Sequence, residues 1–424
     1  MDRIIETLAR ELGKDPRHVE NVVRLLDEGS TVPFIARYRK ELHGAMDDTA
    51  LRTLEERLSY LRGLAERREA VKKAIEAQGK LTEELAAAID AAGTLAEVED
   101  LYRPYKQKRR TRATIARERG LTPLAEVLFA QGADCPVPEE EAGKYLDPEK
   151  GVETVEDALA GASDIIAETV SDDAALRGKL RTLLGRSGYL TSSGISEEDS
   201  VYRLYYDFRQ PLARVQGYQV LAINRGEKEG FLKVGIDLDR EAALPVVRRH
   251  VLIPGSRSMA FVRGAAEDAY DRLLFPSLER EARGQLSDDA YEGAIGQFAL
   301  NLRPLLMQPP VKGKVTMGLD PGYRMGCKVA VVDGTGKVLD TAVVYPTYGE
   351  RQKKEAIAAL EKLIRKHGVE NIAIGNGTAS RETEQMAVEL IRQVNEAGAH
   401  VSYMIVSEAG ASVYSASKLA AEEF

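Results

Sequence analysis

The sequence has little cysteine and no long hydrophobic run. Its 424 residues include two cysteines, Cys135 and Cys327, too few for a disulfide framework, and neither has a Cys or His at metal-ligand spacing. No stretch approaches the roughly 18 consecutive apolar residues that a transmembrane helix needs. The first residues, MDRIIETLARELG, carry acids where a signal peptide is apolar. These absences predict a cytoplasmic protein with no membrane partner and no resident metal.

An overall excess of basic residues is also missing, because the net charge is −8. This value argues against a simple basic nucleic-acid-binding protein, but it hides the distribution of charge along the chain. Residues 103–119 contain eight Lys or Arg and one Glu, whereas residues 138–157 are strongly acidic. The basic segment is therefore a local candidate for contact with an anionic partner.

The length predicts about three domains. The pattern of apolar and polar residues changes twice along the chain, which agrees with this number. Residues 1–195 are predicted to form one helix after another, and one apolar stripe has helical spacing at Leu51, Leu54, Leu58, Leu61 and Leu64. Gly79 is expected to end that helix, and Thr82 to begin the next one. Residues 196–312 are predicted to be a mainly helical connecting region, in which FLKVGIDL alternates like a strand.

The third region, residues 313–424, is predicted to be an α/β domain. Gln308-Pro309-Pro310 marks the boundary before it, because two prolines cannot continue a helix. Strands are expected at VTMGL, CKVAVVD, KVLDTAVVY, 371–374 and 401–406, with helices over 350–367, 380–396 and the final residues. The resulting order, β-β-β-α-β-α-β-α, is that of the ribonuclease-H-like fold, which nucleases share with actin-like nucleotide-binding proteins.

The first candidate site combines Asp320, in Gly-Leu-Asp-Pro-Gly at the end of the first of these strands, with Glu408 after the last. In ribonuclease-H-like nucleases an acid at the first position holds divalent metal beside further carboxylates. Such hydrolysis needs three or four acids, and residues 375–378 offer none, while Glu382 and Glu384 lie too far along the next helix. An ordinary Asp-Pro-Gly turn is the alternative interpretation of the first motif.

The second candidate site is the basic run, because Lys and Arg neutralise phosphates. Its candidate binding residues are Arg103, Lys106, Lys108, Arg109, Arg110 and Arg112. Tyr102 and Tyr105 beside them are of a type that stacks on bases. A solvated helix face followed by a linker remains the alternative.

A third segment, TVPFIARYRKELHG at 31–44, also mixes basic and aromatic residues. Its spacing favours a structural interpretation. Phe34, Ile35 and Tyr38 are expected in the core, with Arg37, Arg39 and Lys40 simply exposed. The Gly-rich turn GNGTAS could bind an anion through its amides, but such turns are too common to predict a site.

Several strings together resemble motifs of the bacterial Tex family of transcription accessory proteins, in the same order and over essentially the whole chain. They are TVPFIARYRKE, VEDLYRPYKQKRRTRATIARERGL, NRGEKEG, RLLFPSLERE and GLDPGYRMGCKVAVVD. The resemblance implies a multidomain protein with a helix-turn-helix-like part in its all-α N-terminal region. It also implies a YqgF domain of RuvC-like, ribonuclease-H fold, followed by helix-hairpin-helix and OB-fold parts, which we expect to be absent from residues 1–424.

The chain departs from the family pattern in three respects. It ends at Phe424, inside the expected last helix of the YqgF domain, so that this domain is expected to be incomplete. The motif match puts Asp320 and Glu408 on two resolvase-like acid positions, and the third would lie beyond the chain end. GYQVLAI replaces a Ser-His-Arg string before NRGEKEG, so no site is assigned there.

The expected function is therefore nucleic-acid binding, to RNA, DNA or both, in support of transcription and without catalysis or a cofactor. One alternative is a nuclease or resolvase that uses Asp320 and Glu408 with Mg²⁺ or Mn²⁺. Another is a protein-binding scaffold that docks on RNA polymerase. The sequence does not indicate a preference between RNA and DNA, nor an oligomeric state.

Overall fold

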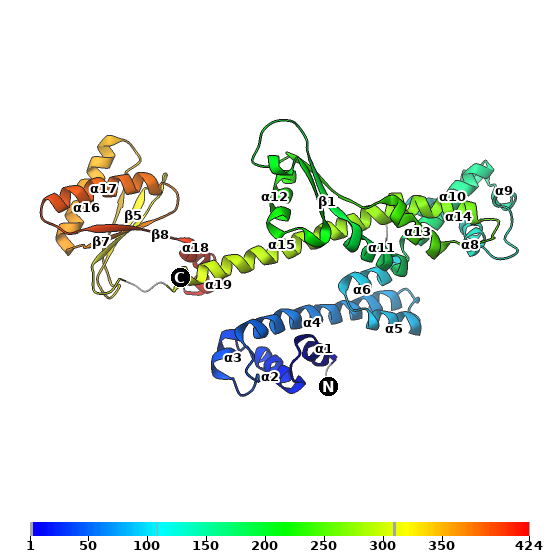
Figure 1. Cartoon of the computed structure of the whole chain (residues 1–424), viewed down its shortest axis with the longest axis horizontal. Coiled ribbons are helices and arrows are strands. Elements are labelled where there is room, and N and C mark those ends of the chain that lie inside the picture. Colours follow the sequence, from blue (N-terminus) through cyan, green and yellow to red (C-terminus); the bar gives the residue numbers. More distant parts are fainter. Residues whose placement is uncertain (1–2, 108, 308–310, 424) are drawn as a thin grey trace. The chain divides into compact units, whose positions relative to one another are not determined.

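The structure, a computed structural model, describes residues 3–107, 109–307 and 311–423. The chain divides into two compact units, Met1–Ala290 and Tyr291–Phe424 (Figure 1). The boundary that the sequence predicts at Gln308-Pro309-Pro310 lies outside the described residues. No helix among the described residues is long and apolar enough to span a membrane.

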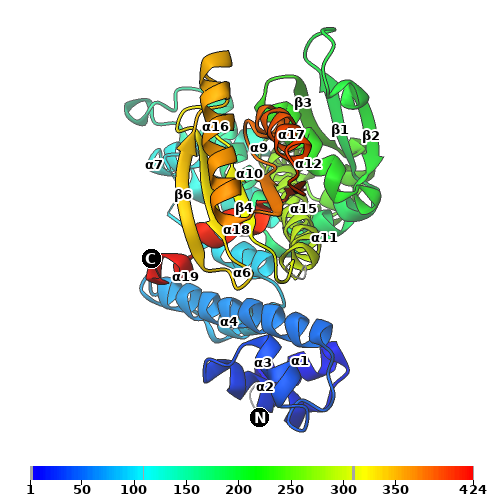
Figure 2. The ribbon, with the colours of Figure 1, turned by 90° about the vertical axis from the view of Figure 1, so that its left-hand side faces the viewer.

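The first unit begins with six helices. They are α1 (Arg3–Leu12), α2 (Pro16–Asp27), α3 (Val32–Tyr38), α4 (Asp48–Glu76), α5 (Glu83–Ala91) and α6 (Leu95–Tyr102). The predicted stripe of leucines on α4 is buried throughout, and α1, α2 and α3 pack on that helix (Figure 2). Thr82 accepts the backbone N–H of Leu85 and so begins α5 as the sequence predicts.

A second hydrophobic core lies among the remaining elements of this unit. Its helices are α7 (Arg112–Glu118), α8 (Thr122–Ala130), α9 (Pro138–Ala142), α10 (Val155–Ser171), α11 (Ala174–Ser187), α12 (Gly217–Lys228), α13 (Arg240–Val251) and α14 (Met259–Asp268). A π-helix over Ala269–Leu274 leads into α15 (Phe275–Leu306). Short 3₁₀ turns occupy Arg103–Tyr105, Gly143–Tyr145, Pro148–Lys150, Arg203–Tyr205 and Leu212–Arg214.

A three-stranded antiparallel sheet interrupts the helices of the first unit. It consists of β1 (Tyr189–Gly194), β2 (Asp207–Pro211) and β3 (Leu232–Asp237) in the order β2-β1-β3. The strand predicted at FLKVGIDL is β3, whereas β1 and β2 were not predicted. The expected helical region 1–195 is thus helical as far as Ser187 and ends in β1.

The second unit contains the predicted α/β domain. Its strands are β4 (Thr316–Asp320), β5 (Cys327–Val332), β6 (Val338–Val344), β7 (Asn371–Gly375) and β8 (Ser402–Val406). Its helices are α16 (Glu350–His367), α17 (Ser380–Glu396), α18 (Ala409–Ser415) and α19 (Lys418–Glu423), and the first two have the predicted bounds.

The five strands form one mixed sheet in the order β6-β5-β4-β7-β8. β5 is antiparallel to both of its neighbours, whereas β4, β7 and β8 are parallel. Met317, Leu319 and Ile374 alternate toward the buried side, in the same core as residues of α16 and α17. This order and these strand directions confirm the ribonuclease-H-like fold.

Candidate functional site

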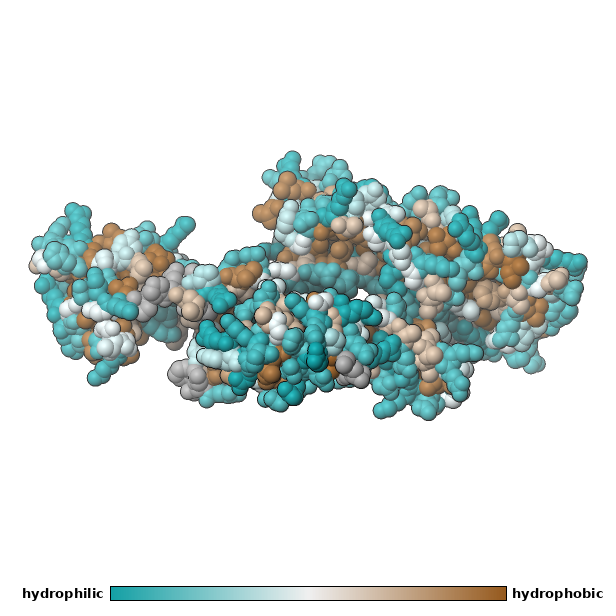
Figure 3. Space-filling view, turned by 60° about the horizontal axis from the view of Figure 1, so that its bottom comes forward, coloured by the Kyte–Doolittle hydropathy of each residue, from teal (hydrophilic) through white to brown (hydrophobic). Residues whose placement is uncertain are grey.

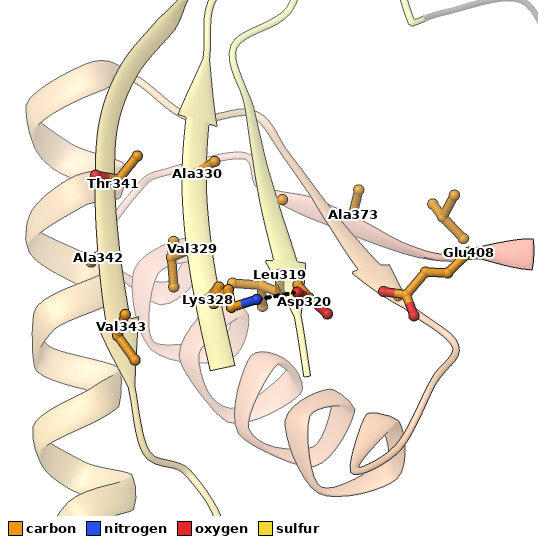
Figure 4. A pocket seen from close by; sticks show the side chains of 13 residues that line it. Leu319, Asp320, Lys328, Val329, Ala330, Thr341, Ala342, Val343, Ala373 and Glu408 are labelled. Atoms are coloured by element: carbon orange, nitrogen blue, oxygen red, sulfur yellow. Dashed lines mark ion pairs between the residues drawn. The ribbon is translucent and has the colours of Figure 1, made fainter. Parts of the chain in front are cut away.

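The two predicted acids lie at the same end of the mixed sheet. Asp320 is the last residue of β4, and Glu408 follows β8 and directly precedes α18. Because β4, β7 and β8 are parallel, their carboxyl ends meet at one edge, where open α/β sheets bind ligands. Both acids line a pocket of about 670 Å³ with small residues such as Gly318 and Ala373 (Figure 4).

Glu408 rests on a glycine cradle, which we define as Gly375 and Gly377. A Cβ atom on Gly375 would lie 1.6 Å from Oε1 of Glu408, and one on Gly377 would lie 2.7 Å from Oε2. The backbone N–H of Glu408 donates to Oδ1 of Asn376 at 3.0 Å, which fixes the start of α18 on the same turn. The Gly-rich turn that the sequence left unassigned therefore holds a carboxylate of the chain itself.

The environment of Glu408 favours its protonated form. Burial raises the pKa of this carboxyl, the negative charge of Asp320 raises it further, and a backbone hydrogen bond from Gly377 opposes both. Burial, and to a lesser extent the negative charges of Asp320 and Glu408, raise the pKa of the Cys327 thiol to about 12. The Asp320 carboxylate is thus close enough to influence Glu408 electrostatically.

Asp320 has a different setting, because it is more exposed and has a cation beside it. Nζ of Lys328 lies 3.5 Å from Oδ2 of Asp320, and both side chains are more than half exposed (Figure 4). Lys328, on the antiparallel neighbour strand β5, was not among the predicted site residues. Only the register of β4 on β5, which sets Asp320 opposite Lys328, brings the two together.

The carboxylates at this edge do not fit a two-metal site. Within residues 3–107, 109–307 and 311–423, no group of three or more His, Cys, Asp or Glu side chains could hold a metal ion. Glu382 accepts a hydrogen bond from the hydroxyl of Tyr323, and Glu384 accepts one from Tyr403, so neither joins the pocket. Hydrolysis through two bound metals needs more anionic ligands than this pocket supplies.

The basic run follows α6 and extends along α7, and much of its charge is neutralised within the fold. Arg103 pairs with Asp172 at 3.1 Å, Lys106 pairs with Glu99, and Arg117 pairs with Glu168 at 2.6 Å. Asp172 and Glu168 lie at the end of α10, more than 50 residues away in sequence. Arg103 and Arg117 therefore help to attach the end of α6 and α7 to α10, whereas the pair of Lys106 is local to α6.

Three further predicted binding residues are exposed. Arg109 and Arg110 lie in the loop before α7, and Arg112 is the first residue of that helix. Arg110 has an ion pair with Glu118 at 2.7 Å, but both side chains are more than half exposed. Such a pair contributes little to stability, so a phosphate could replace the carboxylate. Lys108, the sixth predicted residue, lies outside the described residues.

The two tyrosines beside the basic run are partly buried. Tyr102 and Tyr105 pack against the core of α1 to α6. The Tyr102 ring also lies 5.5 Å from the charged groups of both Arg67 and Lys106. Stacking surfaces for bases are therefore limited on this part of the chain.

The structural interpretation of residues 31–44 was wrong for two of its three aromatic or aliphatic positions. Ile35 is fully buried, but Phe34 is 38% exposed and Tyr38 is 56% exposed. The reason is the helical period: α3 begins at Val32, so that Val32 and Ile35 face the core while Phe34 and Tyr38 share the outer face. Sequence reasoning missed this exposed pair.

Comparison with known proteins matches three family models to the chain. They are the Tex-like protein N-terminal domain over residues 2–76, the Tex central region-like model over 134–298, and the Tex protein YqgF-like domain over 314–424. These ranges include α3, most of the first unit's second core, and the entire mixed sheet with Asp320 and Glu408.

Similar proteins align with nearly all of the chain. It is 46% identical to YdcI of Bacillus subtilis over 99% of this chain and 58% of that protein. It is 44% identical to the transcriptional accessory protein Tex of Neisseria gonorrhoeae, over 99% of this chain and 56% of that one. It is 32% identical to the human S1 RNA-binding domain-containing protein 1, over 99% and 43%. The chain thus spans little more than half of its bacterial relatives, and it belongs to the Tex family.

Proposed function

We propose that this chain binds nucleic acid in support of transcription and catalyses no reaction. The exposed placement of Arg109, Arg110 and Arg112, in a chain of the Tex family, carries the proposal. Guanidinium groups contact phosphates through several donors at once. The names of two relatives, a transcriptional accessory protein and an S1 RNA-binding domain-containing protein, support the same reading. RNA polymerase and the cytoplasm are the partner and the compartment that fit this role.

A triple charge reversal tests the assignment of these arginines. In the full chain, Arg109→Glu/Arg110→Glu/Arg112→Glu should lower affinity for RNA and DNA of any sequence by about tenfold or more at low salt. The reason is that contacts with phosphates position a nucleic acid without reading its sequence. Fluorescence anisotropy with labelled oligonucleotides measures the change.

A matched control distinguishes the effect of the basic run from the effect of a change in net charge. Arg351, Arg365 and Arg392, on α16 and α17, are also exposed, and each pairs with a Glu four residues away. Reversing these three changes net charge by the same amount and should leave affinity nearly unchanged. Equal losses in the two triple variants would contradict a specific role for the basic run.

The competing function, a metal-dependent nuclease, has one observation in its favour, since Asp320 and Glu408 share a pocket. Cleavage of branched or single-stranded DNA with Mn²⁺ that disappears in Asp320→Asn would establish it. We expect no cleavage above background by either protein, because two carboxylates and Lys328 are a poor ligand set for two metals.

A further inference from the structure

The outer side of α3 and the turn after it carry two aromatic rings and three cations. We define the α3 surface as Phe34, Arg37, Tyr38, Arg39 and Lys40. Arg39 is half-buried and the other four residues are exposed. The surface lies far along the chain from the basic run, and neither the proposed function nor the acid pair uses it.

The two rings form one exposed aromatic group. Phe34 and Tyr38 are four residues apart on the helix, and their ring centroids are 5.3 Å apart with planes inclined at 47°. The guanidinium carbon of Arg39 lies 5.1 Å from the Phe34 centroid, within the range of a cation–π contact. The two rings are thus held together beside a positive charge. Both residues also remain accessible to a ligand.

The charges on this surface are free to meet an external anion. Residues 29–46 contain Arg37, Arg39 and Lys40 and a single acid, Glu41. No ion pair of these three cations is present among the described residues, unlike the pairs that neutralise Arg103 and Lys106 in the basic run. An uncompensated cluster of this kind is complementary to a polyanion.

The backbone under the surface is well supported. Val32 and Ile35 are buried on the other side of α3, which packs on α4. The turn that follows is attached to α2, because Nδ2 of Asn21 donates to the carbonyl of Leu42 at 3.2 Å. The rings and cations are therefore presented on a fixed element, which lowers the entropy lost when a ligand binds.

We propose that the α3 surface is a binding site for single-stranded nucleic acid, with bases stacked on Phe34 and Tyr38 and phosphates on the three cations. This inference rests on the proposed function and adds a second site with a strand preference. Exposed aromatic side chains beside Lys and Arg are the usual means of binding single strands, because every unpaired base offers a face for stacking. Bases in a duplex already stack on one another, so duplex DNA gains nothing from the rings.

The double variant Phe34→Leu/Tyr38→Leu tests the stacking in the full chain. Leucine keeps an apolar side chain on α3 but removes the aromatic face. Affinity for oligothymidine should fall about tenfold, in the range measured for loss of base–aromatic stacking, and affinity for duplex DNA should stay within about twofold. Tyr218→Leu, at a tyrosine that is 69% exposed on α12, is the matched control and should change neither.

An abasic oligonucleotide of the same length as the oligothymidine separates stacking on bases from contacts with the backbone. The wild-type chain should bind oligothymidine more tightly than the abasic strand, whereas the double variant should bind both equally. Independently, Arg37→Ala/Arg39→Ala/Lys40→Ala should reduce the salt dependence of single-strand binding by about 2 in the log–log slope, since each phosphate contact contributes about 0.7. This second variant tests the site even where the leucine variant does not fold, as judged by circular dichroism.

The outcomes separate this site from the proposed function. Full single-strand affinity in both α3 variants, with loss in the Arg109, Arg110 and Arg112 variant, would overturn the α3 site and leave nucleic-acid binding in place. Absence of binding by the wild-type chain would overturn both. Unchanged oligonucleotide binding together with loss of RNA polymerase capture in the leucine variant would make this surface a protein-binding one instead.

Discussion

Asp320 and Glu408 show how two carboxylates in one pocket can have different surroundings. Glu408 lies over the glycine cradle, partly removed from water, while Asp320 is exposed beside Lys328. The absence of a side chain at Gly375 is what gives the Glu408 carboxylate its place. Single residues therefore decide how far the Glu408 carboxyl is removed from water.

The pKa of Glu408 should depend on Asp320. Burial is the largest cause of the raised pKa and the charge of Asp320 is the second, so Asp320→Asn should lower the Glu408 pKa but leave it above that of an exposed glutamate. Carboxyl ¹³C NMR as a function of pH measures the titration midpoint of Glu408 in the wild-type chain and in the variant. An unchanged midpoint in the variant would mean that the two charges do not interact.

The same shift has a consequence for stability. A carboxyl whose pKa is higher in the folded than in the unfolded chain stabilises the fold at low pH and loses that contribution as pH rises through the folded pKa. Glu408→Gln should remove this dependence, so that the difference in unfolding free energy between variant and wild type moves in favour of the variant as pH rises from 4 to 7. Urea unfolding at several pH values measures it, and a constant difference would contradict the assignment.

At the scale of elements, a buried ionic network joins α6, α11 and α15. Arg177 is 2% exposed and bonds Asp100, which is 5% exposed and also bonds Arg181 at 2.6 Å. Both arginines pair further with Glu281. A buried charge destabilises the fold when its partner is removed, because neither water nor an opposite charge then compensates it.

Removal of Asp100 should therefore be strongly destabilising. Asp100→Ala leaves the Arg177 guanidinium buried without its carboxylate, and we expect a loss of about 3–5 kcal/mol in the free energy of unfolding. Asp199→Ala is the control, because its pair with Arg203 is exposed on both sides, and its loss should stay below about 1 kcal/mol. Urea unfolding of the two variants measures the difference, and similar losses would contradict the expected cost of leaving Arg177 without its carboxylate.

The sequence predicts those elements whose signals are local. The bounds of α16 and α17 follow from helical periodicity between turn residues, and β4 follows from an apolar run before Asp-Pro-Gly. β1 and β2 escaped prediction because YLTSSG and DFRQP lack the alternation of apolar residues typical of strands. β1 forms by pairing with β2 on one side and, on the other, with β3, which begins more than 30 residues after β1 ends.

The candidate sites also include features with a local sequence signal and features that only the fold creates. The basic run and the Asp320–Glu408 pair are visible in sequence as residue types at particular places. The acids on α10 that neutralise Arg103 and Arg117 are not, because only the fold brings them near. The exposure of Phe34 and Tyr38 was also hidden, since a helix of seven residues is too short to display a clear period.

At the scale of the whole molecule, the proposed function depends on where charge lies along the chain rather than on the net charge. The chain is acidic overall, yet exposed arginines gather at the loop before α7 and cations gather on the α3 surface. Hydrophilic residues cover most of the face shown in Figure 3, with hydrophobic ones scattered among them. An acidic protein with local basic surfaces should bind nucleic acid weakly enough to be sensitive to salt.

The most direct test is the anisotropy of labelled single-stranded RNA, single-stranded DNA and duplex DNA with the full chain across a salt series. We predict binding whose logarithm falls linearly with the logarithm of salt concentration, with a slope of about −2 or steeper for single strands, as three or more phosphate contacts require. Binding that does not change with salt, or no binding of any of the three at about 0.15 M salt, would contradict a nucleic-acid-binding role for this chain.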